Sequence, residues 1–249
     1  MELQGTHRTD VNYSLLLKLT GNMKIRFIKD IFQGISSLLF PVMCIVCKRR
    51  MDETQSLVCE SCWQNLAYLS SDIIKSKPVP DNIDMMIPVF VFDESVQTII
   101  HFLKYNGFKS LGIELGKRVS TKVKNRIPVF KETVLIPVPL HPVKFRERGY
   151  NQSYYIAIGI AEILGLTIHR CLLKRIKNTE TQTKLSATER QQNMQDAFEI
   201  ADGVDLSGIH CAVLIDDVFT TGSTLNSAAG VLKKRGVKEV IGVTVAAPI

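Results

Sequence analysis

Long apolar runs are missing from this sequence. A membrane-spanning helix needs roughly 18 or more consecutive apolar residues with few charges. The most apolar stretch, residues 31–47, is interrupted by polar residues, a glycine and a proline (Gln33, Gly34, Ser36, Ser37 and Pro41). The first 22 residues are polar and lack the continuous apolar region of a secretory signal peptide. We therefore expect a cytoplasmic protein.

The common nucleotide-binding fingerprints are also absent. Neither GxGxxG nor GxxxxGK[ST] occurs in the 249 residues, which argues against a Rossmann dinucleotide fold and a P-loop. Six cysteines are too few, and too unevenly spaced, for the dense disulfide framework of a small secreted domain. The hydrophobic fraction of 45% is that of an ordinary globular protein with a sizeable core.

Negative charge is scarce in the middle of the chain. Residues 101–200 contain 17 Lys and Arg against 8 Asp and Glu, a net charge of +9, whereas the rest of the chain carries −2. A basic segment of this kind suits nucleic acid or an anionic small molecule such as a diphosphate. Solvated surface lysines are the alternative explanation.

Alternating apolar patterns predict the fold class. Strands are expected at residues 85–92, 134–138, 166–173, 212–215 and 240–246, and helices at residues 111–123, 155–164 and 225–232. Strands that alternate with helices favour an α/β fold, a mostly parallel sheet flanked by helices. No internal repeat is visible.

The chain is expected to divide into four parts. Residues 1–22 are interpreted as an upstream extension, with Met23 as the biological start. Residues 23–69 combine an amphipathic helix with a cysteine module, and residues 70–82, rich in Ser, Pro and Lys, form a linker. Residues 83–249 form the α/β domain.

The cysteine module predicts a metal site. Cys44-x-x-Cys47 and Cys59-x-x-Cys62 can direct four thiolates at one tetrahedral centre, which suits a structural Zn²⁺ ion. Disulfides are disfavoured in a cytosolic chain. The module is interpreted equally as a docking element, a nucleic-acid-binding element or a staple for the N-terminal region. The remaining cysteines, Cys171 and Cys211, lie in apolar contexts and are expected to be buried thiols.

Residues 213–224 read VLIDDVFTTGST, an apolar strand that runs into two adjacent carboxylates and a loop of hydroxyl groups. Ligands bind outside the carboxyl ends of parallel strands, where Asp216 and Asp217 fall. Because neighbouring carboxylates repel each other, the pair favours an outside partner. A vicinal diol donates two hydrogen bonds to such a pair, and Mg²⁺ offsets its charge.

The following loop comprises Thr220, Thr221, Gly222, Ser223 and Thr224, and a helix comes after it. Backbone N–H groups and the helix dipole at such a position favour a phosphate, and the glycine permits close approach to the backbone. A diol site beside a phosphate site predicts a ribose 5-phosphate. Taken singly, each part is also explained by a turn followed by a helix N-cap.

This segment resembles the phosphoribosyl-diphosphate motif of the type I phosphoribosyltransferases. The resemblance implies that Asp216 and Asp217 hold the ribose hydroxyls and that residues 220–224 hold the 5-phosphate. The purine-base branch has an acidic residue at the first loop position, where this chain has Thr220. That difference argues against purine salvage through such a base and leaves the catalytic residue unknown.

Two further stretches narrow the resemblance. Residues 136–153 read IPVPLHPVKFRERGYNQS, with basic residues in a loop after a strand, and residues 175–198 read RIKNTETQTKLSATERQQNMQDAF. A solvated basic loop and a polar surface segment are the simpler explanations. With the cysteine pairs and the preceding LLFP, these stretches resemble the ComF/GntX family over residues 40–249. That family is the competence-associated branch of the phosphoribosyltransferase fold.

The ComF/GntX resemblance implies a zinc module, a phosphoribosyltransferase domain and a link to the uptake of transforming single-stranded DNA. Arginine forks suit diphosphate, so Arg146 and Arg148 are candidate diphosphate contacts. Lys104 is a third candidate, in a loop that usually faces the diphosphate in this fold. It is equally explained by an amphipathic surface turn.

Two functions remain open at this point. The first is an enzyme of the phosphoribosyltransferase type that binds phosphoribosyl diphosphate with Mg²⁺ and transfers the sugar to an unknown acceptor. The second is a binding protein for single-stranded DNA or a helicase-like competence partner, with a vestigial or sensory ribose-phosphate pocket. Tyrosines and phenylalanines near the basic residues would stack on bases in the second case.

Overall fold

The computed structural model describes residues 41–51, 56–177 and 197–249. Among these, residues 41–44 and 48–51 belong to one compact unit, and residues 45–47, 56–177 and 197–249 belong to another. The expected upstream extension, the expected amphipathic helix and most of residues 175–198 lie outside the described residues. The predicted domain boundaries therefore stay predictions.

The smaller unit contains a tight turn. The backbone N–H of Lys48 donates to the carbonyl of Cys44 at 2.9 Å, and the N–H of Cys44 donates to the carbonyl of Arg49 at 2.9 Å. Met43 and Arg50 pair as an isolated antiparallel bridge. Lys48 has a positive φ of 59°, the left-handed conformation that closes such a turn.

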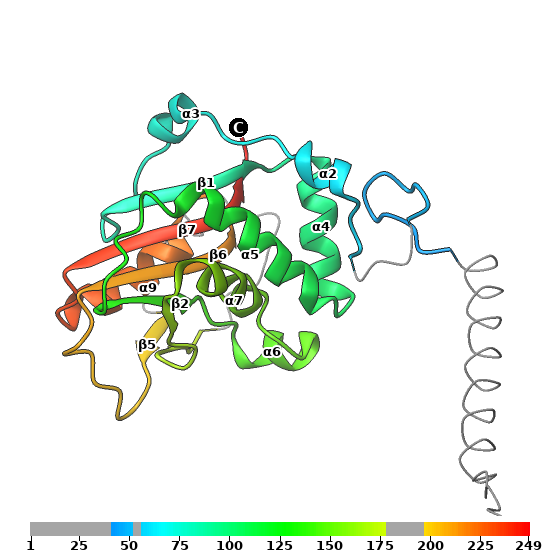
Figure 1. The fold of residues 1–249 in the computed structure, drawn as a ribbon. Helices are drawn as coiled ribbons and strands as arrows, with labels where there is room; N and C mark the ends of the chain where they lie inside the picture. The colour runs from blue at the N-terminus through cyan, green and yellow to red at the C-terminus, as the bar shows by residue number, and fades with distance from the viewer. Residues whose placement is uncertain (1–40, 52–55, 178–196) are drawn as a thin grey trace, which may run out of the picture. The chain divides into compact units, whose positions relative to one another are not determined.

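The larger unit is built on a parallel sheet. Its five described strands lie in the order β1-β7-β6-β2-β3 (Figure 1), and all neighbouring pairs are parallel. The strands are β1 (Met85–Val91), β2 (Thr133–Pro137), β3 (Thr167–Ile168), β6 (Cys211–Val218) and β7 (Glu239–Ala247). A separate antiparallel pair is formed by β4 (Leu173–Arg175) and β5 (Phe198–Ile200).

Helices cover both faces of the sheet (Figure 1). Helices α5 (Lys109–Val123) and α7 (Gln152–Leu164) pack against each other and against one face, and α9 (Ser223–Lys234) packs against β6 and β7 from the other. The central strands are mostly apolar and largely buried, as a doubly covered parallel sheet requires. The other helices of the described residues are α2 (Glu60–Gln64), α3 (Ser71–Ser76), α4 (Glu94–Tyr105) and α6 (Pro142–Arg148).

Two glycines allow α5 and α7 to cross closely. A Cβ atom on Gly116 would lie 2.1 Å from the carbonyl oxygen of Ile156, and one on Gly159 would lie 2.0 Å from that of Ile113. Neither distance is compatible with a side chain, so the crossing requires glycine at both positions. This contact holds α7 against α5, and the first turn of α7 carries residues of the candidate site.

Local signals explain where the helices near the site begin and end. Asp93 caps α4 by accepting a hydrogen bond from the N–H of Val96 at 2.9 Å. Asn151 caps α7 in the same way, with the N–H of Ser153 at 3.0 Å. Gly149, with φ of 78°, ends α6 in the left-handed conformation.

The fold prediction is confirmed, and several local predictions are wrong. Lys104 lies in the last turn of α4, not in a loop, because the apolar residues of this segment repeat at helical spacing. The basic segment after β2 is the short helix α6, which Pro142 begins. Residues 166–173 do not form one strand but contribute to β3 and the start of β4.

The two isolated cysteines have different environments. Cys211 is buried in β6, as predicted, and burial raises the pKa of its thiol to about 12. Cys171 is exposed, so its prediction as a buried thiol is wrong. It lies in the connection between β3 and β4, where the chain leaves the five-stranded parallel sheet.

Candidate functional site

The two aspartates of VLIDDVFTTGST lie within the carboxyl end of β6. The strand continues through Val218, so Asp216 and Asp217 are still part of the ladder with β7. Asp216 stands opposite Thr244 of β7, and the preceding Ile215 stands opposite Pro137 of β2. The pair is therefore held by β7 on one side and lies just beyond the last residue paired with β2 on the other, at the edge where parallel sheets bind ligands.

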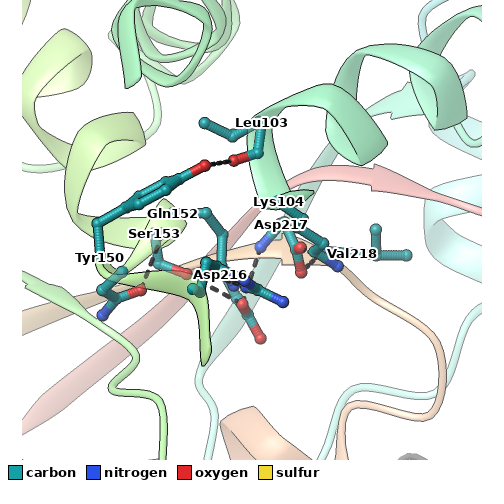
Figure 2. Close-up of polar contacts among 10 residues, drawn as sticks. Leu103, Lys104, Tyr150, Gln152, Ser153, Asp216, Asp217 and Val218 are labelled. Atoms are coloured by element: carbon teal, nitrogen blue, oxygen red, sulfur yellow. Dashed lines mark hydrogen bonds and ion pairs between the residues drawn. The ribbon is translucent and has the colours of Figure 1, made fainter. Parts of the chain in front are cut away.

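Lys104 neutralises part of this acidic pair. Its ammonium, at the end of α4, forms an ion pair with the carboxylate of Asp217 (Figure 2). Burial of the ammonium acts to lower the pKa of Lys104, but the charges of Asp217 and Asp216 outweigh burial, and the pKa is raised. Lys104 is therefore firmly protonated while the carboxylates are charged.

Asp216 is held by the start of α7. The hydroxyl of Ser153 and the backbone N–H of Asp217 both donate to the Asp216 carboxylate, at 3.2 and 2.9 Å (Figure 2). Burial, with the neighbouring negative charge of Asp217, raises the pKa of Asp216 to about 7. The hydrogen bonds and Lys104 oppose this shift without cancelling it. A carboxyl group whose pKa is raised by burial and a neighbouring charge is typical of functional sites.

A cavity of about 150 Å³ opens above the aspartate pair. Basic side chains from α4, α6 and β4 line it together with both carboxylates (Lys104, Lys144, Arg148 and Arg175). The guanidinium of Arg148 donates to the side-chain carbonyl of Gln152 and lies 5.4 Å from the ring centre of Tyr105. Cations beside carboxylates form a site suited to a ligand that has both phosphate and hydroxyl groups.

The structure brings together some of the predicted diphosphate contacts. Lys104 and Arg148 line the cavity, whereas Arg146 is exposed on α6 and is not among the lining residues. Arg175 lines the cavity and was missed by the sequence analysis. Burial lowers the pKa of Arg175, and the charge of Asp216 partly offsets this effect. The only feature of the sequence that pointed to Arg175 was its position as the first residue of the polar stretch 175–198.

The hydroxyl loop leads into α9 through Gly222. This residue is the N-cap, with φ of 72°, and it provides no side-chain cap. A Cβ atom here would lie 2.6 Å from both Phe219 and Pro80, so the turn requires glycine. Thr221 accepts a long hydrogen bond of 3.4 Å from the N–H of Ser223, and the hydroxyl groups of Thr221 and Ser223 are hydrogen-bonded to each other at 3.0 Å.

The loop hydroxyls differ in their exposure. Thr220 and Thr221 are exposed, Ser223 and Thr224 are half-buried, and Thr224 lines the cavity beside the aspartates. A simple N-cap does not account for this loop, because the cap residue has no side chain. The hydroxyls of Thr221 and Ser223 bond to each other, and Thr224 is the loop hydroxyl that faces the cavity.

Four thiol groups gather in the cysteine module. The sulfur atoms of Cys44, Cys47, Cys59 and Cys62 all lie within 4.8 Å of one another. The sulfur atoms of Cys47 and Cys59 are 3.7 Å apart. Zn–S bonds of about 2.3 Å in a tetrahedron place sulfur atoms about 3.8 Å apart. The donor set and its spacing fit a metal ion such as zinc.

Comparison with known proteins supports the presence of a phosphoribosyltransferase-like domain. The model of the phosphoribosyl transferase domain matches residues 151–249, which include α7, the aspartate pair and the hydroxyl loop. Competence protein F of Haemophilus influenzae is 30% identical over 188 residues, which cover 73% of this chain and 81% of that protein. The chain belongs to the competence protein F, or ComF, family.

Further ComF relatives carry related names. The DNA utilization protein YhgH of Salmonella typhimurium is 27% identical over 201 residues, 80% of this chain and 87% of that protein. Competence protein ComFC of Bacillus subtilis is 28% identical over 151 residues, 59% of this chain and 58% of that protein. The predicted ComF resemblance and phosphoribosyltransferase-like fold are confirmed. Among the described residues of this ComF protein, no helix is long and apolar enough to cross a membrane.

Proposed function

We propose that the cavity above Asp216 and Asp217 binds 5-phosphoribosyl 1-diphosphate, or a closely related ribose phosphate, together with Mg²⁺. The observation that carries this proposal is the pair of strand-end carboxylates beside a group of cations. An acidic pair alone suits a sugar or a metal, and a cationic cluster alone suits a phosphate. A ribose that bears phosphate groups satisfies both at once.

Each part of the ligand has a partner in this arrangement. The carboxylates of Asp216 and Asp217 accept hydrogen bonds from the vicinal hydroxyls of the ribose. The loop from Thr220 to Thr224, with the N-terminal amides of α9, holds the 5-phosphate. Lys104 and Arg148 hold the diphosphate, with Arg146 as a further candidate, because an arginine fork or an ammonium offsets its negative charge.

Magnesium fits the same donors. Mg²⁺ prefers oxygen ligands, and it is commonly held by one or two carboxylates with the phosphates of a substrate. Asp216 and Asp217 are the carboxylates that line the cavity. When bound, the ion neutralises charge on the diphosphate. The side chains that line the cavity contribute the shape of the binding site and the remaining positive charge.

The chemistry that this site favours is displacement of diphosphate from C1 of the ribose. As the C1–O bond breaks, its electron pair leaves with the diphosphate and positive charge develops on the ring. Cations held around the leaving group stabilise the transition state electrostatically. Thr220 supplies no base at the loop position that is acidic in purine-type enzymes, so the acceptor must be activated differently.

We assign the four-cysteine group as a structural zinc site. Four thiolates complete a tetrahedral shell and leave no position open for a substrate. The names of the relatives contain the words "competence" and "DNA utilization". These names support a role in the cytoplasmic handling of DNA that has been taken up. Zinc would then keep the module folded while the ribose-phosphate pocket acts.

A second candidate function is favoured by exposed aromatic residues near the cations. Tyr105, Phe108 and Phe145 are 68%, 37% and 48% exposed, and Arg148 packs on the Tyr105 ring. Such a surface suits single-stranded DNA, and a helicase-like protein of the uptake machinery is a further expected partner. Binding of a polyanion through the basic residues must weaken steeply as salt rises. An oligonucleotide affinity that stays constant between low and moderate salt excludes this mode.

Thermal unfolding with and without ligand tests the primary proposal. Specific binding to the folded state raises the unfolding temperature by mass action. We expect phosphoribosyl diphosphate with Mg²⁺ to stabilise the wild-type protein and not the Asp216→Asn, Asp217→Asn double variant. The matched control is Asp72→Asn, an exposed carboxylate on α3, which should behave as wild type. Equal shifts in all three proteins would contradict the proposal.

A further inference from the structure

The first turn of α9 lacks the local support that most helices have. Its N-cap is Gly222, which has no side chain to accept a hydrogen bond from the helix. A capping side chain would accept from the N–H of the second or third helical residue. Those N–H groups are also the donors that a phosphate at a helix N-terminus uses. A first turn that serves a phosphate therefore needs a support from outside the helix.

That support comes from residues 80–84, which lead directly into β1 and are called the strap below. Pro80 lies against the start of α9, because a Cβ atom on Gly222 would be only 2.6 Å from the Pro80 ring. Asp84 lies near the other end of the helix, where its carboxylate forms an ion pair with Lys233 at 2.6 Å. The strap thus follows α9 from its N-cap to its last turn.

Asn82, in the middle of the strap, is hydrogen-bonded to Asn226 at the end of the first turn of α9. The backbone N–H and the side-chain amide of Asn82 both donate to the side-chain oxygen of Asn226, at 2.9 and 3.1 Å. The amide also donates to the Asn226 carbonyl at 3.4 Å. The two residues are 144 positions apart in the sequence. The contact therefore joins the first turn of α9 to a distant segment of the chain.

The strap is also anchored independently of α9. The N–H of Ile83 donates to the carbonyl of Pro80 at 2.9 Å, and the Ile83 side chain is buried in the core. The N–H of Asp84 donates to the carbonyl of Val240 in β7 at 2.9 Å, and the Asp84 carboxylate accepts from the Val240 N–H at 2.7 Å. Because the sheet holds the strap, the strap can fix the position of the helix end beside it.

We propose that Asn82 is a positioning residue for the 5-phosphate site and that it acts through Asn226. This role rests on the function proposed above, in which residues 220–224 and the N-terminal amides of α9 hold the 5-phosphate. Donors that are already in place lose less freedom when a ligand binds, so their preorganisation raises affinity. Because the strap holds the first turn from the side, no capping side chain has to occupy the N–H groups that a phosphate would use.

A strap that only stabilised the fold would have a different effect. Its loss would lower the unfolding temperature and weaken every ligand of the cavity to a similar extent. A positioning role affects only the part of the ligand that α9 holds. The proposed diphosphate contacts, Lys104 and Arg148, are carried by α4 and α6. Binding of inorganic diphosphate is therefore an internal control for the intact cavity.

Calorimetric titration of ribose 5-phosphate and of inorganic diphosphate, each with Mg²⁺, distinguishes the two roles. The variants are Asn226→Ala, Asn82→Ala and the double variant. Alanine is the best helix former, so Asn226→Ala removes the contact without weakening α9 itself. The matched control is Asp84→Asn, which breaks the ion pair at the far end of the strap and keeps an oxygen acceptor for the Val240 N–H.

The two single alanine variants should each weaken ribose 5-phosphate binding about five- to tenfold, as expected for the loss of one or two hydrogen bonds between neutral groups. Diphosphate binding in these variants, and ribose 5-phosphate binding in Asp84→Asn, should change by less than about twofold. The double variant should lose no more than Asn226→Ala alone, because residues that act as a pair have non-additive effects.

Unchanged ribose 5-phosphate affinity in Asn226→Ala overturns the positioning role and leaves the proposed function standing. An equal loss of diphosphate binding, or an equal loss of ribose 5-phosphate binding in Asp84→Asn, also overturns it, because the strap would then act on the fold as a whole. A wild-type protein that does not bind ribose 5-phosphate overturns the proposed function itself, and the positioning role with it.

Discussion

The ammonium of Lys104 is paired with the carboxylate of Asp217 across the gap between α4 and β6. These residues are far apart in the sequence, and each sits at the end of its element. Asp216 and Asp217 are adjacent, and their carboxylates repel each other. The ammonium of Lys104 supplies a positive charge that offsets this repulsion. A cation that already faces the carboxylates is also placed to meet a diphosphate that arrives beside them.

Replacement of Lys104 by methionine should weaken binding of phosphoribosyl diphosphate more than binding of ribose 5-phosphate. Only the first ligand carries a diphosphate for the ammonium to contact, and one charge-assisted contact is worth roughly 1.5–3 kcal/mol. We expect a loss of about tenfold or more for the diphosphate and a much smaller loss for ribose 5-phosphate. Calorimetric titration of both ligands measures the difference. Equal losses would place Lys104 elsewhere in the site.

Arg148 and Arg146 provide a comparison within one helix. Arg148 lines the cavity and Arg146 does not, so Arg148→Ala should reduce affinity for phosphoribosyl diphosphate about tenfold, with a smaller effect for Arg146→Ala. Both variants remove the same charge from α6, which controls for long-range electrostatics. A larger loss in Arg146→Ala would show that the exposed arginine turns inward when the ligand binds.

Asp216 should make the unfolding free energy fall as pH rises from about 4 to about 7. Its pKa is about 7 in the folded protein against an ordinary 3.8, so the folded state binds the proton more tightly than the unfolded state. Asp216→Asn removes this titration. Relative to wild type, the variant should gain roughly 2 kcal/mol between pH 5 and pH 8, after allowance for solvent screening.

Thermal unfolding across this pH range checks the Asp216 prediction. From the lower to the upper end of this range, the unfolding temperature of the Asn variant should rise by roughly 5 °C relative to that of the wild type. Asp72→Asn should run parallel to wild type, because Asp72 is exposed on α3. If the curves of Asp216→Asn and wild type are parallel as well, Asp216 does not titrate near neutral pH.

Removal of the metal should unfold the cysteine module. The sulfur spacing fits a tetrahedral ion, and metal binding at such a site is coupled to folding. We expect one zinc ion per chain by elemental analysis and a lower unfolding temperature after chelation. Cys47→Ser should reproduce the loss, and Cys171→Ser, at an exposed cysteine outside the group, should not. Full metal content in Cys47→Ser would contradict the assignment.

The crossing of α5 and α7 should not tolerate a methyl group. Gly159→Ala would place its Cβ against the backbone of Ile113, and overpacking of this kind costs typically about 1–3 kcal/mol or more. The matched control is Gly208→Ala, because no atom lies within 4 Å of the Cβ position there and its φ is not positive. Chemical denaturation should separate the two variants clearly. A neutral Gly159→Ala would mean that the helices can move apart without cost.

The sequence predicted best the features that a short segment encodes by itself. Asp216 and Asp217 were expected at the end of an apolar strand and lie there, and the parallel sheet followed from alternation of apolar patterns. Partnerships between distant segments were not predictable. The contacts of Lys104 with Asp217 and of Ser153 with Asp216 depend on how α4 and α7 pack, which no local pattern specifies.

Misjudged residues lie where tertiary context overrides local composition. Cys171 sits in an apolar stretch but is exposed, because the chain leaves the sheet between β3 and β4. Arg175 begins a polar stretch that gives no sign of a site, although the pairing of β4 with β5 brings this residue to the cavity. In both cases the decisive factor is the path of the backbone rather than the type of residue.

The most direct measurement is calorimetric titration of phosphoribosyl diphosphate with Mg²⁺ into the wild-type protein and into the Asp216→Asn, Asp217→Asn double variant. The account predicts saturable binding with one site per chain for wild type and no detectable binding for the double variant, with both proteins folded by circular dichroism. Binding of similar affinity in the folded double variant would contradict the assignment of the aspartate pair to the ribose.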